Sequence, residues 1–278
     1  MTRLTTLDLR SKKADSTKIV MVTAYDATMA RLVDKADVDM ILVGDSLGMV
    51  IQGHADTLSV TLDQVVYHTR CVTRVVERAH VSGDLPFGSY QISVEDALRS
   101  ATRVIQEGGA QSVKLEGGER MAPTVARLVE IGIPVVGHVG LTPQSVHAMG
   151  GFRVQGRGVE EGVRIVRDAV ALQEAGAFCV VLEGIPVDVA AEITARLTIP
   201  TIGIGAGPHC DGQVLVCNDL LGMNSTFQPK FVKRYAALDG VIATAMRSFG
   251  EDVRSGAFPD LEHSFVRKAA PRVVARLV

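Results

Sequence analysis

The sequence predicts an α/β fold built as a single (β/α)8 TIM barrel. Its 278 residues contain eight short apolar segments that alternate with longer segments of helical character. This alternation is typical of a parallel sheet with right-handed crossovers, and eight strands close such a barrel. A doubly wound open sheet is the main alternative, but it would have edge strands, which should be more polar than these segments. No segment has the composition of a linker between domains.

The expected strands are short runs rich in Val, Ile and Leu that end at polar or glycine-rich positions. They cover residues 18–25, 39–45, 80–84, 111–116, 134–140, 177–183, 200–207 and 213–217. The third is the weakest, because His80, Ser82 and Asp84 interrupt its apolar character.

Capping residues mark the starts of several helices between these strands. Asp26, the pair Thr61 and Gln64, and the pair Ser93 and Asp96 are typical of helix N-termini. The expected helices cover residues 27–36, 61–79, 93–107, 119–131, 159–175 and 187–197.

Both ends of the chain extend beyond the predicted barrel. Residues 1–16 form a leading arm or a short helix, and the part after residue 217 is mostly helical with a break near residues 256–259. We therefore expect one barrel domain over residues 1–265 and a basic tail over residues 266–278, which contains Lys and Arg but no acids.

The composition excludes several classes of function. Hydrophobic residues make up 47% of the chain and charged residues 22%, and the net charge of −2 leaves no excess of Lys and Arg to neutralise nucleic-acid phosphates. No apolar stretch is long enough to span a membrane, and the N-terminus does not resemble a signal peptide. The four cysteines show no zinc-like spacing, and Cys179 lies in an apolar run that suits a reduced core thiol. We expect a cytoplasmic protein.

Acidic residues end four of the predicted strands: Asp45, Asp84, Glu116 and Glu183. A buried carboxylate needs a compensating charge, and in a barrel the C-terminal ends of all strands share one face. The first three acids belong to neighbouring strands, so a divalent ion that prefers oxygen ligands would relieve their repulsion. Mg²⁺ fits this set better than zinc, because no histidine cluster accompanies the acids. Alternatively, such acids cap the following helices or pair with surface Arg residues.

Three further positions have chemistry that suits a site. Lys114 lies two residues before Glu116, so strand alternation places both inside the barrel, where Lys114 is either a counter-charge or an anion hook. His138 is either a polarising group or a hydrogen-bonded core residue. Glu183 is separated from the other acids and is a candidate general base. The segment 203–207, Gly-Ile-Gly-Ala-Gly, either cradles a phosphate or forms a tight turn.

Six motifs occur in order along the chain: VGDSLGM at 43–49, GDLPF at 83–87, VKLEGG at 113–118, GHVGLTPQS at 137–145, VQGR at 154–157 and GIGAG at 203–207. Together they resemble one enzyme family, the 3-methyl-2-oxobutanoate (ketopantoate) hydroxymethyltransferases. The resemblance extends from about residue 4 to Phe265. Two departures are the basic tail, which is longer than the family pattern, and Gly184 in a variable segment; neither affects a proposed ligand.

The resemblance implies a barrel of the phosphoenolpyruvate/pyruvate type that assembles as a decamer. It implies transfer of a hydroxymethyl group from 5,10-methylenetetrahydrofolate to 3-methyl-2-oxobutanoate through a magnesium-stabilised enolate, giving 2-dehydropantoate for pantothenate biosynthesis. By the same resemblance Asp45, Asp84 and Glu116 bind Mg²⁺, Ser46, Asp84 and Lys114 contact the oxo acid, and Glu183 accepts the proton. We also expect Asp45 and His138 to contact the substrate.

Two rival functions are compatible with the same residues. One is a magnesium-dependent lyase or mutase on the same barrel, although Cys210, the only cysteine in a loop, does not lie in a lyase-like motif. The other is a non-catalytic barrel that senses a metal–oxo-acid complex, in which Glu183 would have no chemical role.

Overall fold

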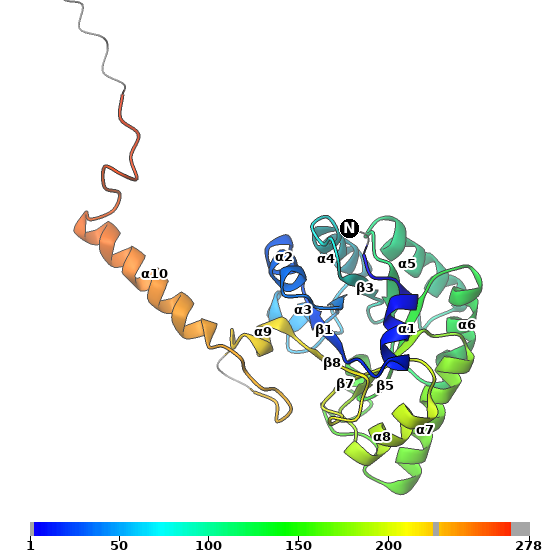
Figure 1. Cartoon of the computed structure of the whole chain (residues 1–278). Helices are drawn as coiled ribbons and strands as arrows, with labels where there is room; N and C mark the ends of the chain where they lie inside the picture. Colours follow the sequence, from blue (N-terminus) through cyan, green and yellow to red (C-terminus); the bar gives the residue numbers. More distant parts are fainter. Residues whose placement is uncertain (1–2, 225–227, 268–278) are drawn as a thin grey trace, which may run out of the picture.

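The computed structural model describes residues 3–224 and 228–267. In it, eight parallel strands form a closed barrel in chain order, and β8 pairs with β1 (Figure 1). The strands are β1 (Ile19–Thr23), β2 (Met40–Val43), β3 (His80–Asp84), β4 (Ser112–Lys114), β5 (Val135–Gly140), β6 (Cys179–Glu183), β7 (Thr201–Ile204) and β8 (Gly212–Leu215). The predicted barrel is confirmed, and its closure excludes the open sheet.

Helices connect the strands and cover the outside of the barrel. They are α1 (Thr6–Ala14), α2 (Ala27–Lys35), α3 (Leu47–Val50), α4 (Leu62–Thr73), α5 (Val94–Gln106), α6 (Ala122–Glu130), α7 (Val159–Glu174), α8 (Val187–Arg196), α9 (Cys217–Leu220) and α10 (Leu238–Ser255), with 3₁₀ turns η1 (Glu119–Met121) and η2 (Pro143–Ser145). The expected caps form: Asp26 accepts from two backbone N–H groups of α2, and Thr61 with Gln64 makes a capping box on α4.

The apolar core has two layers, one on each side of the sheet. Inside the barrel, alternate strand residues pack on Leu9 of α1, which is fully buried. The larger cluster lies between the strands and the surrounding helices. Cys179 belongs to the inner layer as a free thiol, and burial raises its pKa, so the predicted core thiol is confirmed.

Several elements end earlier than predicted; for example, the strands predicted over 111–116 and 200–207 end at Lys114 and Ile204. The predicted strand 39–45 ends at Val43, which places Asp45 in the turn before α3. The helix predicted to reach residue 79 ends at Thr73, because the Asp34 carboxylate accepts hydrogen bonds from the backbone N–H groups of residues 77–79. A side chain from a different helix therefore replaces the helical partners of these groups.

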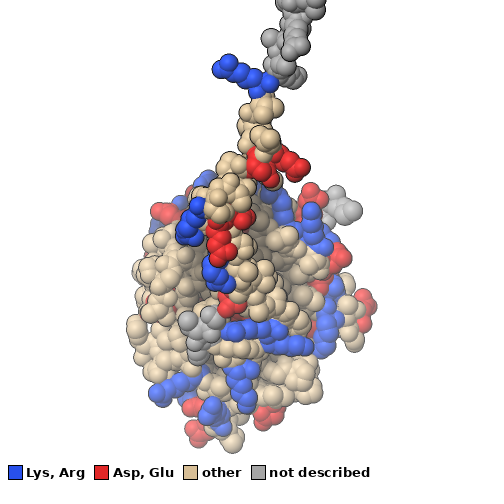
Figure 2. Space-filling model, turned by 90° about the vertical axis from the view of Figure 1, so that its left-hand side faces the viewer, with Lys and Arg blue, Asp and Glu red and all other residues tan. Residues whose placement is uncertain are grey.

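Helix α10 stands away from the barrel, and only its N-terminal end adjoins it (Figure 1). On the face from which it projects, basic and acidic side chains are interspersed among large areas of other residues (Figure 2). None of the helices in the described ranges is long and apolar enough to cross a membrane. Most of the predicted basic tail 266–278 lies outside the described residues.

Candidate active site

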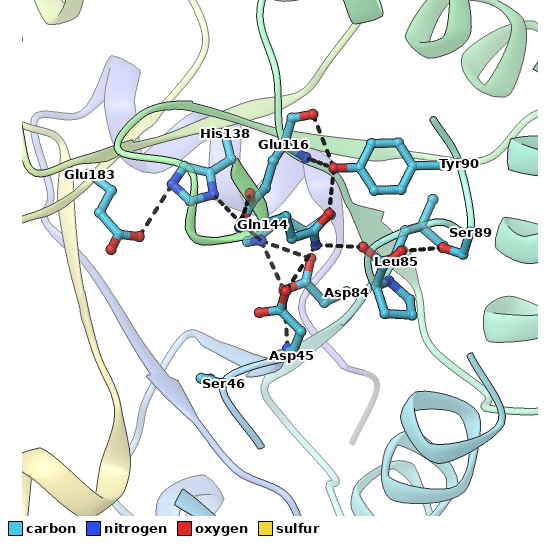
Figure 3. A network of polar contacts seen from close by, with 12 residues as sticks. Asp45, Ser46, Asp84, Leu85, Ser89, Tyr90, Glu116, His138, Gln144 and Glu183 are labelled. Atoms are coloured by element: carbon cyan, nitrogen blue, oxygen red, sulfur yellow. Dashed lines mark hydrogen bonds and ion pairs between the residues drawn. The ribbon is translucent and has the colours of Figure 1, made fainter. Parts of the chain in front are cut away.

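The C-terminal ends of β3 to β6 bring five polar side chains together inside the barrel (Figure 3). Asp84 ends β3, and its register partner Lys114 ends β4. Glu116 lies two residues beyond Lys114 and therefore points to the same side, as predicted. His138 lies on β5 and Glu183 ends β6. Only Glu183 is partly accessible, with 17% of its side chain exposed.

Lys114 is the cation nearest to the acids. Its Nζ lies 2.7 and 2.8 Å from the two carboxylate oxygens of Asp84 and 3.9 Å from Glu116 Oε1. The backbone N–H of Asp45 also donates to Asp84, over 3.3 Å. Lys114 is therefore a counter-charge to the acids, and its ammonium group lies among the residues predicted to hold the substrate.

Burial and mutual repulsion change the pKa values of Asp45, Asp84 and Glu116 to different extents. Burial raises the pKa of Asp45, and the charges of Asp84 and Glu116 raise it further. Burial also raises the pKa of Asp84, although Lys114 opposes this. Burial acts in the same direction on Glu116, but contacts with His138, Lys114 and the Gln144 N–H lower its pKa overall. The ionised forms of Asp45 and Asp84 are thus disfavoured, because nearby cations compensate their charge incompletely.

His138 lies between Glu116 and Glu183. Its Nδ1 is 3.5 Å from Glu116 Oε1 and its Nε2 is 3.2 Å from Glu183 Oε2 (Figure 3). Neither nitrogen is aligned for a hydrogen bond, so both contacts are ionic. Burial lowers the pKa of His138, but the two carboxylates outweigh it and raise the pKa to about 9. His138 is therefore charged at neutral pH and connects the inner acids to Glu183.

The sequence analysis did not identify Gln144 and Tyr90 as part of this network. The Gln144 amide donates to Asp45 Oδ2 over 2.9 Å, and its backbone N–H donates to Glu116 Oε2 over 3.0 Å. The Tyr90 hydroxyl donates to Gln144 Oε1 over 2.8 Å and accepts from the Glu116 N–H over 3.0 Å. Gln144 lies within one of the six motifs, which was the only sequence signal for it.

All seven predicted site residues line one cavity of about 720 Å³ at this end of the barrel. They are Asp45, Ser46, Asp84, Lys114, Glu116, His138 and Glu183. Ser46 is placed by a 2.7 Å hydrogen bond between its hydroxyl and that of Tyr25. A cavity of this size that joins buried acids, a buried lysine and a partly exposed carboxylate is typical of an enzyme active site.

Comparison with known sequences assigns the chain to a family. The family model described as "Ketopantoate hydroxymethyltransferase" matches residues 3–261. The chain belongs to the ketopantoate hydroxymethyltransferase family. Relatives named 3-methyl-2-oxobutanoate hydroxymethyltransferase from Pelobacter propionicus and Moorella thermoacetica are 58% and 56% identical to it, over 95% of this chain and 97% and 98% of theirs. The chain is therefore an enzyme of the hydroxymethyltransferase kind, as its motifs predicted.

Solved structures of other enzymes share the fold of this hydroxymethyltransferase. Phosphonopyruvate hydrolase, solved with oxalate and Mg²⁺, matches with a TM-score of 0.60 at 13% identity, over 94% of this chain and 93% of that one. A 2,3-dimethylmalate lyase of the phosphoenolpyruvate mutase/isocitrate lyase superfamily matches with a TM-score of 0.58 at 18% identity, over 94% and 92%. At this identity the likeness concerns the fold alone, and it agrees with a (β/α)8 barrel.

The carboxylates of this hydroxymethyltransferase site suit Mg²⁺ as ligands, but in this structure they are not arranged around one metal position. Asp45, Asp84 and Glu116 supply carboxylate oxygens, the ligands that Mg²⁺ prefers. Within the described ranges, no three His, Cys, Asp or Glu side chains are already grouped as a metal site requires. Asp84 is paired with Lys114 and Asp45 with Gln144. A metal would have to replace these partners, and the incompletely compensated charge of Asp45 and Asp84 favours that exchange.

Proposed function

We propose that this chain transfers a hydroxymethyl group from 5,10-methylenetetrahydrofolate to 3-methyl-2-oxobutanoate and so forms 2-dehydropantoate. The observation that supports this best is the pairing of a buried acid cluster with Glu183, which lies on the opposite side of His138 in the same cavity. The names of the relatives indicate the oxo acid. We further propose that the enzyme acts in the cytoplasm, in pantothenate biosynthesis.

We assign the inner end of the cavity to the oxo acid. Lys114 and the hydroxyl of Ser46 bind its carboxylate, because they are the buried cation and a hydroxyl donor beside Asp45 and Asp84. Asp45, Asp84 and Glu116 would hold Mg²⁺, which when bound polarises the keto oxygen and stabilises negative charge that develops on it. His138 orients Glu183 through its Nε2 contact.

Glu183 is the proposed proton acceptor. Its carboxylate takes the C3 proton of the oxo acid, and the electron pair of the broken C–H bond then forms the new bond to the methylene carbon of the folate. Water supplies the hydroxyl oxygen as both C–N bonds of the methylene carbon break, and the C3 proton and one water proton pass to N5 and N10 of the tetrahydrofolate that leaves. Glu183 suits this role because it lines the cavity while it is fixed by a contact to only one of its oxygens, Oε2.

The test is proton NMR of 3-methyl-2-oxobutanoate in D₂O with enzyme and Mg²⁺. We expect the C3 proton signal to disappear with the wild type and to persist with Glu183→Gln, which keeps the shape of the side chain but is no base; the exchange rate should fall at least about 100-fold. Omission of Mg²⁺ should also stop the exchange. A Glu183→Gln enzyme that exchanges at the wild-type rate would disprove the assignment of the base.

The two rival functions give different results in the same assay. A sensor would bind the oxo acid without exchanging its protons. A lyase or mutase would leave 3-methyl-2-oxobutanoate unbound, so that neither line broadening nor exchange is seen.

We also propose that the chain assembles as a homo-oligomer, a decamer by the family resemblance. The exposed apolar surface of α10 supports the proposal of an oligomer. Val241, Ile242, Met246, Phe249 and Val253 are each more than 40% exposed, although large apolar side chains are usually buried. Contact with another copy of the chain would remove this surface from water.

A further inference from the structure

The active-site cavity is larger than a small 2-oxo acid requires, and its chemistry changes from the inner end to the mouth. The charged side chains Asp45, Asp84, Lys114 and Glu116 line the inner end and are at most 5% exposed. The mouth has a different lining, which the proton transfer to Glu183 does not use. The second part of the cavity therefore needs an explanation of its own.

Five large apolar side chains surround the mouth. Met49, Phe152, Val154, Val187 and Phe231 all line the cavity, and they are 38%, 50%, 42%, 47% and 41% exposed. They come from α3, from the loop after η2, from the start of α8 and from the loop that leads to α10. A cluster of exposed apolar side chains that is continuous with an active site indicates a binding surface for an apolar or aromatic group.

Two cations accompany this apolar surface. Arg153 lies between Phe152 and Val154, and Lys230 directly precedes Phe231; both are exposed and both line the cavity. In the part of the chain that the structure describes, neither head group takes part in an ion pair. Asp219 is the only acid that lines the mouth, and it is half-buried. The mouth thus combines an apolar floor with two cationic groups free to bind an anion.

We propose that this mouth, formed by Met49, Phe152, Arg153, Val154, Val187, Lys230 and Phe231, is the subsite of the folate co-substrate. The inference rests on the proposed function, because it takes methylenetetrahydrofolate as the donor. Folate has flat rings that suit Phe152 and Phe231, and a glutamyl tail whose carboxylates suit Arg153 and Lys230. Because the cavity is continuous, the methylene carbon can reach the oxo acid beside Glu183 while the tail stays at the rim.

The first test is a double variant, Arg153→Gln with Lys230→Gln. We expect its KM for methylenetetrahydrofolate to rise about tenfold, which corresponds to about 1.4 kcal/mol. The KM for the oxo acid should stay unchanged, and so should the folate-independent exchange of the C3 proton, because that step does not use the mouth. The matched control is Arg164→Gln with Lys35→Gln, two exposed cations that do not line the cavity; its folate KM should equal that of the wild type.

Two further measurements separate the tail from the rings. The wild type should bind tetrahydrofolate triglutamate more tightly than the monoglutamate, and the double variant should lose this preference. Phe152→Ala should weaken both folates about equally, because it removes ring contact and leaves the cations in place. Together these patterns distinguish a folate subsite from a general effect on the fold.

The outcomes separate this inference from the proposed function. If the double variant and Phe152→Ala both keep the wild-type folate KM while proton exchange is intact, the folate subsite is wrong and the proposed chemistry stands. If the wild type itself shows no proton exchange, the proposed function fails, and so does the subsite that rests on it. If the control variant loses folate affinity as strongly as the double variant, the effect is a general one of charge, which also rejects the subsite.

Discussion

Gln144 contacts two of the three buried acids, although it carries no charge itself. Its side-chain amide donates to Asp45 Oδ2 and to the carbonyl of Leu85, and its backbone N–H donates to Glu116. Its own oxygen accepts from Tyr90. One residue thus fixes the distance between two acids that follow different strands, β2 and β4. Partners of this kind orient ligands, and their loss typically costs about 10–100-fold in affinity or activity.

Gln144→Leu should therefore impair the site without unfolding the protein. The substitution keeps the approximate size of the side chain but leaves Asp45 without its amide donor, so we expect kcat/KM for the oxo acid to fall about 10–100-fold and Mg²⁺ to bind more weakly. Steady-state kinetics and a calorimetric Mg²⁺ titration measure the two effects. Gln91→Leu is the control, since it removes two 2.8 Å hydrogen bonds of the exposed Gln91, its donation to Gln144 Oε1 and its acceptance from the Gly88 N–H, and neither bond involves an acid. Similar losses in both variants would contradict a specific role for Gln144.

The charged site residues could be predicted from the sequence, whereas Gln144 and Tyr90 could not. A carboxylate that follows an apolar strand is conspicuous because burial without a partner is costly, and strand alternation then fixes the direction of Lys114 and Glu116. Gln144 lies in the short 3₁₀ turn η2 and Tyr90 in a loop, and in neither does a periodic pattern fix the direction of a side chain. Their contacts to Glu116 span 28 and 26 residues of the chain and arise only once the barrel closes.

Among the elements, all eight strands were predicted, whereas the end of α4 was misplaced by six residues. Most strands of this closed parallel barrel, though not β1 and β8, are buried on both faces, so their apolar runs are nearly continuous and easy to recognise. The end of α4 could not be predicted, because it depends on the Asp34 carboxylate, which belongs to α2 and comes into reach only in the folded chain. Local capping pairs were predicted correctly because both of their partners lie within one turn.

The N-terminal arm and β3 are joined by a histidine that titrates far from its usual range. The ring of His80 lies 3.1 Å from the carbonyl of Leu4 and 2.8 Å from the hydroxyl of Ser112. Burial lowers the pKa of His80 to about 4, so the folded protein keeps this ring neutral where an unfolded chain would protonate it. The stabilisation is complete above the unfolded pKa of about 6.5 and is lost as the pH falls from there towards 4.

His80 should therefore make the folded protein less stable in mild acid. Between pH 7 and pH 5 we expect the free energy of unfolding to fall by about 2 kcal/mol from His80 alone, because the unfolded state binds the proton and the folded state does not. Urea unfolding at both pH values measures the change. In His80→Gln the fall should be smaller by this amount, while the exposed His209→Gln should behave like the wild type. Equal falls in all three proteins would show that His80 is not the cause.

In the whole molecule, the barrel and α10 differ in how far their apolar side chains are buried. The barrel buries two apolar layers around a single site, as a self-contained domain does. On α10, by contrast, none of the 18 residues is buried. Ile242, Met246, Phe249 and Val253 recur at helical spacing and form one apolar stripe along it. A helix with such a stripe gains stability mainly by packing, so the proposed oligomer would stabilise α10.

Assembly of the chain should depend on this stripe. Met246→Glu with Phe249→Glu places two charges among side chains that are 68% and 56% exposed here and that would be buried in an oligomer. Because burying an uncompensated charge costs several kcal/mol, we expect light scattering after size exclusion to show a shift from a multiple of the 29.6 kDa chain to much smaller species. Thr244→Glu with Ser248→Glu adds the same charge to the opposite face of α10 and should assemble normally. If the stripe variant keeps the wild-type mass, the oligomer forms through another surface.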